Sequence, residues 1–259
     1  MLPVPVLFED SDVLVLNKPA DLVVHSDGRT DEPTVVDWLL TNRPEVKGVG
    51  EPLVKDEGLK IKPARRSLGA GGDSERSLDR SGIVHRLDRE TSGALLIAKN
   101  QLAFGKLKKQ FQKQQVRKTY HAFVYGRVKN DEGVIDRPIA RSRVNPVLWS
   151  ATRGRKGEDR EAVTEYRVLK RTDEFTLLEL HPRTGRTHQL RVHLKAINYP
   201  VVCDKLYAPN RECALGFSRL ALHSRALSFL HPISGERMTV ESSYPKDFEA
   251  ALKILNLDS

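Results

Sequence analysis

Asp88 lies between two arginines in the run of residues 85–93, directly before an apolar segment. Arg86 precedes it by two residues, and Arg89 follows it. Fixed positive charge on both sides favours an ionised carboxylate near neutral pH, which suits a nucleophile or a base rather than an acid. A surface salt bridge at a turn is the commoner role of such an aspartate, so this spacing alone leaves both interpretations open.

A second segment, residues 181–193, contains several basic or potentially basic side chains and no acid. Apolar residues recur at helical spacing on one face of it, and basic residues fall on another: Leu190, Leu194 and Ile197 against His188, Arg191 and Lys195. We therefore expect a turn at Thr184-Gly185 that opens a short helix with a basic side. An ordinary amphipathic helix would explain the periodicity but not the absence of acidic residues from this segment.

These segments resemble the motifs of one family, the RluA-type pseudouridine synthases. The run that begins at His85 reads His-Arg-Leu-Asp, two variable residues and Thr-Ser-Gly, and it matches the family signature at every fixed position. Residues 184–193 resemble the family's Thr-Gly-Arg-Thr-His-Gln-Leu-Arg-Val-His segment, and residues 118–122 resemble its Lys-x-Tyr-x-Ala strand. Asn17-Lys18-Pro19 resembles the first family motif, although Asp21 stands where that motif has Gly. The four matches occur in the family's order.

The resemblance implies three catalytic residues. Asp88 is the expected catalytic carboxylate, and Arg191 is expected to pair with it through a charge-assisted contact. The ring of Tyr120 is expected to stack on the target uracil, and its hydroxyl is a candidate to handle the proton at carbon 5. Taken alone, a tyrosine on a strand is more often a core residue with its hydroxyl hydrogen-bonded.

The resemblance also implies a set of substrate-binding residues. A uridine in structured RNA cannot reach Asp88 while it is stacked, so the base should be flipped into the site. Arg86 matches the family arginine that enters the space left by the base, and His85 is expected to support the same turn. Arg186 and His188 complete the expected set. Residues 91–93 are expected to shape the turn rather than to react.

The implied reaction is the isomerisation of uridine to pseudouridine. The bond from N1 to the sugar breaks, the uracil turns, and carbon 5 joins the sugar. Asp88 could attack the anomeric carbon or abstract the proton at the sugar's 2-position, and the sequence leaves both routes open. No redox step or energy source is involved, so we expect no cofactor. A second carboxylate of the glycosidase kind is not required, because the uracil is retained.

The expected fold class is α+β, with a mixed, mainly antiparallel sheet split around a central catalytic cleft and helices packed outside. Strands are expected in the apolar runs 13–16, 94–98, 119–124, 163–169 and 175–180, and a helix is expected after Asn100, a good N-cap. Residues 44–80 and 153–160 are polar or basic and predict loops, the first a flexible insertion. We expect one catalytic domain over residues 1–259, without the N-terminal RNA-binding domain that the family often carries.

Composition narrows the choice of partner. The 259 residues include 43 Lys and Arg against 34 Asp and Glu, a net charge of +9, so a polyanion such as RNA is the natural partner. Cys203 and Cys213 form no paired ligand motif, and together with the lack of a signal peptide they predict a reduced, cytoplasmic chain. We expect no metal site, no membrane span and a monomer.

Three interpretations remain open at this stage. Ribosomal RNA of the large subunit is the favoured substrate, because it is the commoner target in the family that the chain resembles. Transfer RNA is the alternative within the family. A non-catalytic RNA-binding or ribosome-assembly protein would share charge and fold, but it would have no need to keep Asp88, Tyr120 and Arg191 together.

Overall fold

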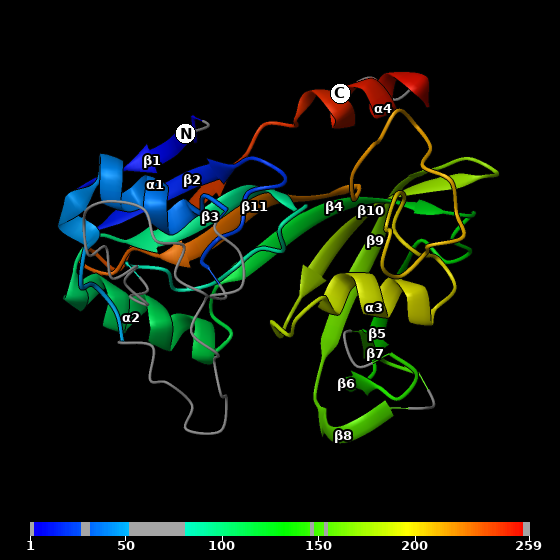
Figure 1. The fold of residues 1–259 in the computed structure, drawn as a ribbon, viewed down its shortest axis with the longest axis horizontal. Coiled ribbons are helices and arrows are strands. Elements are labelled where there is room, and N and C mark those ends of the chain that lie inside the picture. The colour runs from blue at the N-terminus through cyan, green and yellow to red at the C-terminus, as the bar shows by residue number, and fades with distance from the viewer. Residues whose placement is uncertain (1–2, 27–31, 52–80, 146–147, 153–154, 256–259) are drawn as a thin grey trace, which may run out of the picture.

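The structure is a computed structural model that describes residues 3–26, 32–51, 81–145, 148–152 and 155–255. In this part of the chain nine strands form one large sheet, in the order β1-β2-β3-β11-β4-β10-β9-β5 with β12 on β11 (Figure 1). Their bounds are β1 Val6–Glu9, β2 Val13–Lys18, β3 Ser92–Ala98, β4 Arg117–Tyr125, β5 Glu132–Asp136, β9 Val163–Arg171, β10 Phe175–Pro182, β11 Leu222–Leu230 and β12 Arg237–Glu241. A second, three-stranded sheet contains β6 Ile139–Ser142, β7 Trp149–Ser150 and β8 Arg155–Arg160.

The large sheet is mixed, as the sequence predicted. Strands β3 and β11 pair in parallel, and the other pairs in this sheet are antiparallel. At the parallel pair Gly93 lies opposite Ser224 with φ +108°, and a Cβ on Gly93 would lie 2.2 Å from the Ser224 carbonyl oxygen. The glycine of the Thr-Ser-Gly motif is therefore required by the close approach of two backbones.

Helices cover both faces of the sheet. The helices are α1 Val35–Asn42, α2 Gln101–Gln112, α3 Gln189–Ala196 and α4 Lys246–Ile254, with a 3₁₀ helix at Pro44–Val46. Leu14 and Leu16 pack in the cluster that contains α1, whereas Val13 and Val15 pack against α2, so these two helices cover opposite faces of β2. Figure 1 shows α2 and α3 on one side of the sheet and α4 on the other.

The five predicted strands are confirmed within β2, β3, β4, β9 and β10. The predicted helix is also confirmed: the Asn100 side chain accepts the Ala103 N–H at 2.9 Å and begins α2. Phe104 and Leu107 of α2 are buried, and each such side chain stabilises the fold by about 1.5–3 kcal/mol.

Of the two predicted loops, one is wrong in part and the other lies mostly outside the described residues. The basic segment 153–160 is not a loop throughout, because residues 155–160 form β8, which pairs with β6. Cross-strand pairing and packing on Trp149 override its polar composition. In the predicted insertion 44–80, the first residues form the 3₁₀ helix, and residues 52–80 lie outside the described residues.

The prediction of reduced cysteines is wrong. Cys203 and Cys213 form a disulfide, with their Cα atoms 4.4 Å apart. The bond closes a loop that carries Asp204 and Tyr207, and the chain path of this loop has no signature in the cysteine spacing. No helix in the described part of the chain is long and apolar enough to cross a membrane.

Candidate active site

A cleft of about 460 Å³ opens on the face of the sheet that carries α2 and α3, which is a size typical of small-ligand sites. The end of α2, the Asp88 turn, β4 and the start of α3 line it. All seven residues predicted for the site lie in its wall: His85, Arg86, Asp88, Tyr120, Arg186, His188 and Arg191. The structure therefore brings together residues from three motifs that are far apart in the sequence.

The Asp88 carboxylate is partly exposed in this cleft, with a side-chain exposure of 19%. Its backbone carbonyl accepts the Thr91 N–H at 3.1 Å and closes the turn. Arg89 does not contribute the neighbouring charge, because it pairs with Glu32 at 2.8 Å. The charge comes instead from Arg191, whose Nη1 lies 3.6 Å from Asp88 Oδ2.

Two buried cations hold the Asp88 turn from beneath. Lys18 has no exposed surface, and its ammonium donates to the carbonyls of Pro19, Leu22 and Arg89 at 2.7–2.9 Å. Burial lowers the pKa of Lys18 to about 7, while the charge of Asp88 opposes this shift. Arg219 donates to the Glu90 carbonyl at 3.1 Å. The Asn-Lys-Pro motif therefore positions the Asp88 turn, although it lies about seventy residues earlier in the chain.

Arg191 is itself held by a carboxylate that the sequence did not indicate. Its Nε and Nη2 donate to the two oxygens of Asp204 at 2.8 and 2.7 Å, and both side chains are buried. Burial alone would lower the pKa of Arg191, but the hydrogen bonds and charge of Asp204, together with Asp88, raise it above its usual value. Asp204 is the acid that the segment 181–193 lacks, supplied from the disulfide loop.

His188 is fixed in a conformation that few residues other than glycine adopt, with φ 56° just before α3. The Tyr207 hydroxyl accepts the Trp149 N–H at 3.1 Å and lies 2.9 Å from His188 Nδ1. Burial raises the pKa of Tyr207 to about 12, so the hydroxyl keeps its proton and can donate it to Nδ1. A hydrogen bond of this polarity assigns neutral His188 as the tautomer with its proton on Nε2. Burial also lowers the pKa of His188, against the charge of Asp88.

Tyr120 and His85 form another part of the wall. Tyr120 is buried on β4, and burial together with the charge of Asp88 raises the pKa of its phenol, which keeps the hydroxyl protonated. His85 accepts the Leu96 N–H at Nε2, at 2.9 Å, and stacks on Phe111 with ring centroids 4.8 Å apart. Burial and the charge of Lys118 lower the pKa of His85 to about 3, so this ring is neutral.

The exposed rim of the cleft is basic. Arg86 and Arg186 are both exposed, and Arg186 Nε donates to the Glu161 carbonyl at 3.0 Å. Lys118, which sequence reasoning did not select for the site, lines the cleft and donates to the Thr184 carbonyl at 2.8 Å. Burial lowers its pKa to about 8. The sequence feature that could have indicated Lys118 is its position two residues before Tyr120 in the Lys-x-Tyr-x-Ala match.

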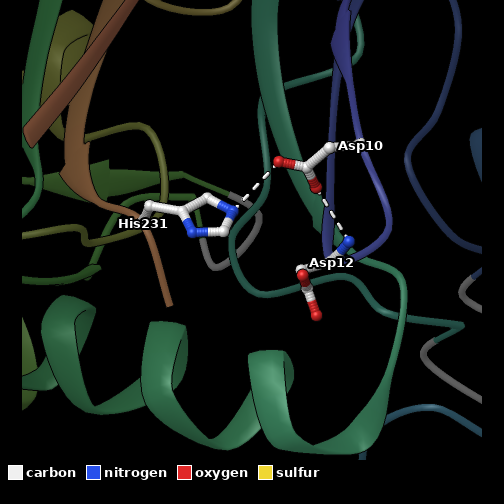
Figure 2. Close-up of side chains that lie close together, drawn as sticks. All are labelled: Asp10, Asp12 and His231. Carbon is white, nitrogen blue, oxygen red and sulfur yellow. Dashed lines mark hydrogen bonds and ion pairs between the residues drawn. The ribbon is translucent and has the colours of Figure 1, made fainter. Parts of the chain in front are cut away.

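A separate group of carboxylates and a histidine, Asp10, Asp12 and His231, gathers at the turn between β1 and β2 (Figure 2). His231 Nε2 lies 3.0 Å from Asp10 Oδ2, and Asp10 Oδ1 accepts the N–H groups of Asp12 and Val13. The Asp12 carboxylate accepts from Asn100 and Ser11. These bonds tie the turn to the end of β11 and to the start of α2.

Comparison with known proteins agrees with this geometry. Residues 12–196 match the family model described as RNA pseudouridylate synthase. The chain is 35% identical over 254 residues to the "Uncharacterized RNA pseudouridine synthase slr1629" of Synechocystis, covering 98% of this chain and 69% of that protein. It is 33% identical to the "Ribosomal large subunit pseudouridine synthase D" of Zymomonas mobilis, covering 100% of this chain and 74% of that protein.

A solved structure, "Human RNA Pseudouridylate Synthase Domain Containing 4", superimposes with a TM-score of 0.70 at 25% identity, covering 98% of this chain and 94% of that one. The pseudouridine synthase fold predicted from the motifs is thus confirmed. With the family model spanning most of the chain and the three motifs meeting in one cleft, the chain belongs to the RNA pseudouridylate synthase family.

Proposed function

We propose that the chain isomerises a uridine in large-subunit ribosomal RNA, with Asp88 as the catalytic carboxylate. The observation that carries this proposal is the placement of Asp88 in the cleft beside Arg191, with Tyr120 in the same wall. The choice of RNA is supported by relatives named ribosomal large subunit pseudouridine synthase D. Transfer RNA is the second candidate.

In the proposed mechanism the flipped uridine places its sugar against Asp88. Arg191 Nη1, 3.6 Å from Asp88 Oδ2, places a positive charge beside the carboxylate. By attack on the anomeric carbon, the carboxylate oxygen forms a bond to that carbon while the N1 bond breaks, and the electron pair leaves with the uracil. By the other route, Asp88 takes the proton from the 2-position and the N1 bond breaks in the same way. In the first route carbon 5 then attacks the anomeric carbon and the bond from that carbon to Asp88 breaks, which frees the carboxylate. In the second route carbon 5 bonds to the anomeric carbon while Asp88 returns the proton to the 2-position. In both routes carbon 5 loses its proton and N1 gains one, so the product is an isomer of uridine.

Four further side chains are proposed to act on the base and its surroundings. The Tyr120 ring is the stacking surface, and its protonated hydroxyl is a hydrogen-bond donor at the cleft floor. His188, with its proton on Nε2, presents a neutral donor to an oxygen of the flipped nucleotide. Arg86 and Arg186 at the rim bind the surrounding RNA, with Arg86 entering the vacated stack. We further propose that the enzyme works as a cytoplasmic monomer without metal or cofactor.

The test is to map pseudouridine in ribosomal and transfer RNA from cells that lack this gene, complemented with wild type, with Asp88→Asn or with Asp173→Asn. Asp173 is the matched control, because its side chain is 97% exposed and, among the described residues, its ion pair is with Arg127 at the surface. We expect one or more large-subunit sites to return with wild type and the control but not with Asp88→Asn.

Other outcomes separate the alternatives. Restoration of sites in transfer RNA alone would move the target to that RNA. Restoration by Asp88→Asn would remove Asp88 from the catalytic role. If no variant restores any site while all of them bind RNA, the non-catalytic RNA-binding interpretation takes over.

A further inference from the structure

The small sheet β7-β6-β8 carries a group of cations that the proposed mechanism does not use. They line a hollow of about 290 Å³ together with a tryptophan, a glycine and one acid. We call this the basic hollow, lined by Arg141, Trp149, Lys156, Gly157, Glu158 and Arg160. It is distinct from the cleft of Asp88, with which it shares no lining residue.

Like charges face one another across the strands of this sheet. Arg141 on β6 lies directly opposite Lys156 on β8, and both are exposed. Like charges opposite each other on adjacent strands destabilise a sheet. The neighbouring Arg155 is neutralised by Asp159 at 2.8 Å, whereas Lys156 has no ion pair within the described part of the chain. An anion bound between the two strands would remove this repulsion.

Trp149 organises the two arginines. The guanidinium of Arg141 lies 4.3 Å from the ring centre, and that of Arg160 lies 5.6 Å from it. A guanidinium placed over an aromatic face is held in position, and its planar fork of N–H donors matches the geometry of a phosphate. The hollow thus combines positioned planar donors with a lysine, which is the chemistry that recognises a phosphodiester.

The small sheet is fixed to the wall of the catalytic cleft. The Trp149 side chain packs in one cluster with Tyr207 and with Val192 of α3, and the Trp149 backbone N–H donates to the Tyr207 hydroxyl. Tyr207 in turn contacts His188, which lines the cleft. The contacts through Trp149 and Tyr207 therefore fix the position of the basic hollow relative to the wall of the cleft.

We propose that the basic hollow binds a backbone phosphate of the RNA strand whose target uridine occupies the Asp88 cleft. This rests on the proposed function, because RNA is the ligand of both sites. A charged surface that merely keeps the protein soluble would not require the cations to be opposed across strands and stacked on a tryptophan. The hollow would add affinity and register, and it would take no part in the chemical step.

The experiment compares two triple variants that each remove three positive charges. The test variant is Arg141→Gln, Lys156→Gln and Arg160→Gln. The matched control is Lys129→Gln, Lys170→Gln and Arg237→Gln, at exposed positions outside the cleft and the hollow. A transcript of large-subunit ribosomal RNA is the probe, bound on filters at a series of KCl concentrations. Single-turnover pseudouridine formation is measured at saturating protein, and equal unfolding midpoints check the folding of both variants.

We expect the test variant to bind on the order of tenfold more weakly. The slope of its log affinity against log salt should fall by about 0.7–0.9 for each phosphate that the protein no longer neutralises. Its rate at saturating protein should equal that of wild type, and the control should retain the wild-type slope. A conservative variant, Arg141→Lys with Arg160→Lys, should keep most of the slope because it keeps the charge.

Equal weakening of the test and control variants would overturn the inference, since net charge alone would explain both. Unchanged affinity with a lower saturating rate would also overturn it, because the small sheet would then only support the cleft. If wild type binds the transcript but forms no pseudouridine in any RNA, the proposed function fails. The difference in salt slope between the test and control variants would still show whether the basic hollow binds a phosphate.

Discussion

Arg191 binds Asp204 through two buried hydrogen bonds of 2.8 and 2.7 Å, and its third nitrogen lies 3.6 Å from Asp88, the proposed catalytic carboxylate. Asp204 thus orients the guanidinium, and the opposite side of the group faces Asp88. Two of its nitrogens are committed to Asp204, so the nitrogen that faces Asp88 has a fixed direction. Asp204 is a positioning residue that acts through Arg191.

Asp204→Asn should lower stability and activity together. The substitution leaves Arg191 buried without its ion pair, which costs about 3–5 kcal/mol of unfolding free energy. Displacement of the guanidinium from Asp88 should slow single-turnover pseudouridine formation on the order of 100-fold. Urea unfolding and single-turnover assays measure the two effects, with Asp159→Asn as an exposed ion-pair control. A destabilised variant that keeps the wild-type rate would limit Asp204 to a role in the fold.

Tyr207→Phe should change the protonation of His188. If the Tyr207 hydroxyl donates to Nδ1, it stabilises the neutral ring, and its removal raises the pKa of His188. The variant should lose activity at a less acidic pH than wild type, with a rate about 3–10-fold lower near neutrality because the hydrogen bond is missing. Single-turnover pH profiles of both proteins test this, with Tyr199→Phe as the control. Superimposable profiles would contradict the assigned tautomer.

The sequence could predict the site where its parts lie in contiguous motifs. Asp88, Tyr120 and Arg191 could be expected to line one cleft because each lies in a recognisable motif, and the sheet strands could be predicted because their apolar runs are long. Asp204 could not be found in this way, since it meets Arg191 only through a loop whose path depends on tertiary packing. The strand β8 was missed for a related reason: its polar composition predicts a loop, and only pairing with β6 makes it a strand.

His85 should make stability depend on pH below neutrality. Burial lowers its pKa from 6.5 to about 3 in the folded protein, so the unfolded chain binds a proton there that the folded protein does not. The stability it contributes is complete above about pH 6.5 and is lost as the pH falls toward 3, at up to about 1.4 kcal/mol per pH unit.

His85→Gln keeps an acceptor for the Leu96 N–H but cannot titrate. Urea unfolding across this pH range should therefore show that the stability advantage of wild type over the variant narrows with acid. A constant difference would mean that His85 is already protonated or exposed in the folded protein. His223, whose pKa burial also lowers to about 3, offers a second position for the same comparison.

Gly93→Ala should disrupt the centre of the sheet and the catalytic turn together. Gly93 pairs with Lys18 on β2 and with Ser224 on β11, and Ser224 pairs with Tyr120 on β4. One row of paired residues therefore connects Lys18, which holds the Asp88 turn, to Tyr120 in the cleft wall. An alanine Cβ would lie 2.2 Å from the Ser224 carbonyl oxygen, at a backbone φ of +108° that disfavours it. We expect a loss on the order of 3–5 kcal/mol and little remaining activity.

Gly105→Ala is the matched control for this substitution. Gly105 lies inside α2, and a Cβ there meets nothing within 4 Å. Alanine should stabilise the helix by about 0.5–1 kcal/mol and leave the rate of pseudouridine formation unchanged. Thermal unfolding of both variants and wild type measures the effect. If the close approach of β3 and β11 requires glycine at position 93, the unfolding midpoint falls in Gly93→Ala and rises in Gly105→Ala. A fully stable Gly93→Ala protein would show instead that the two strands can separate without cost.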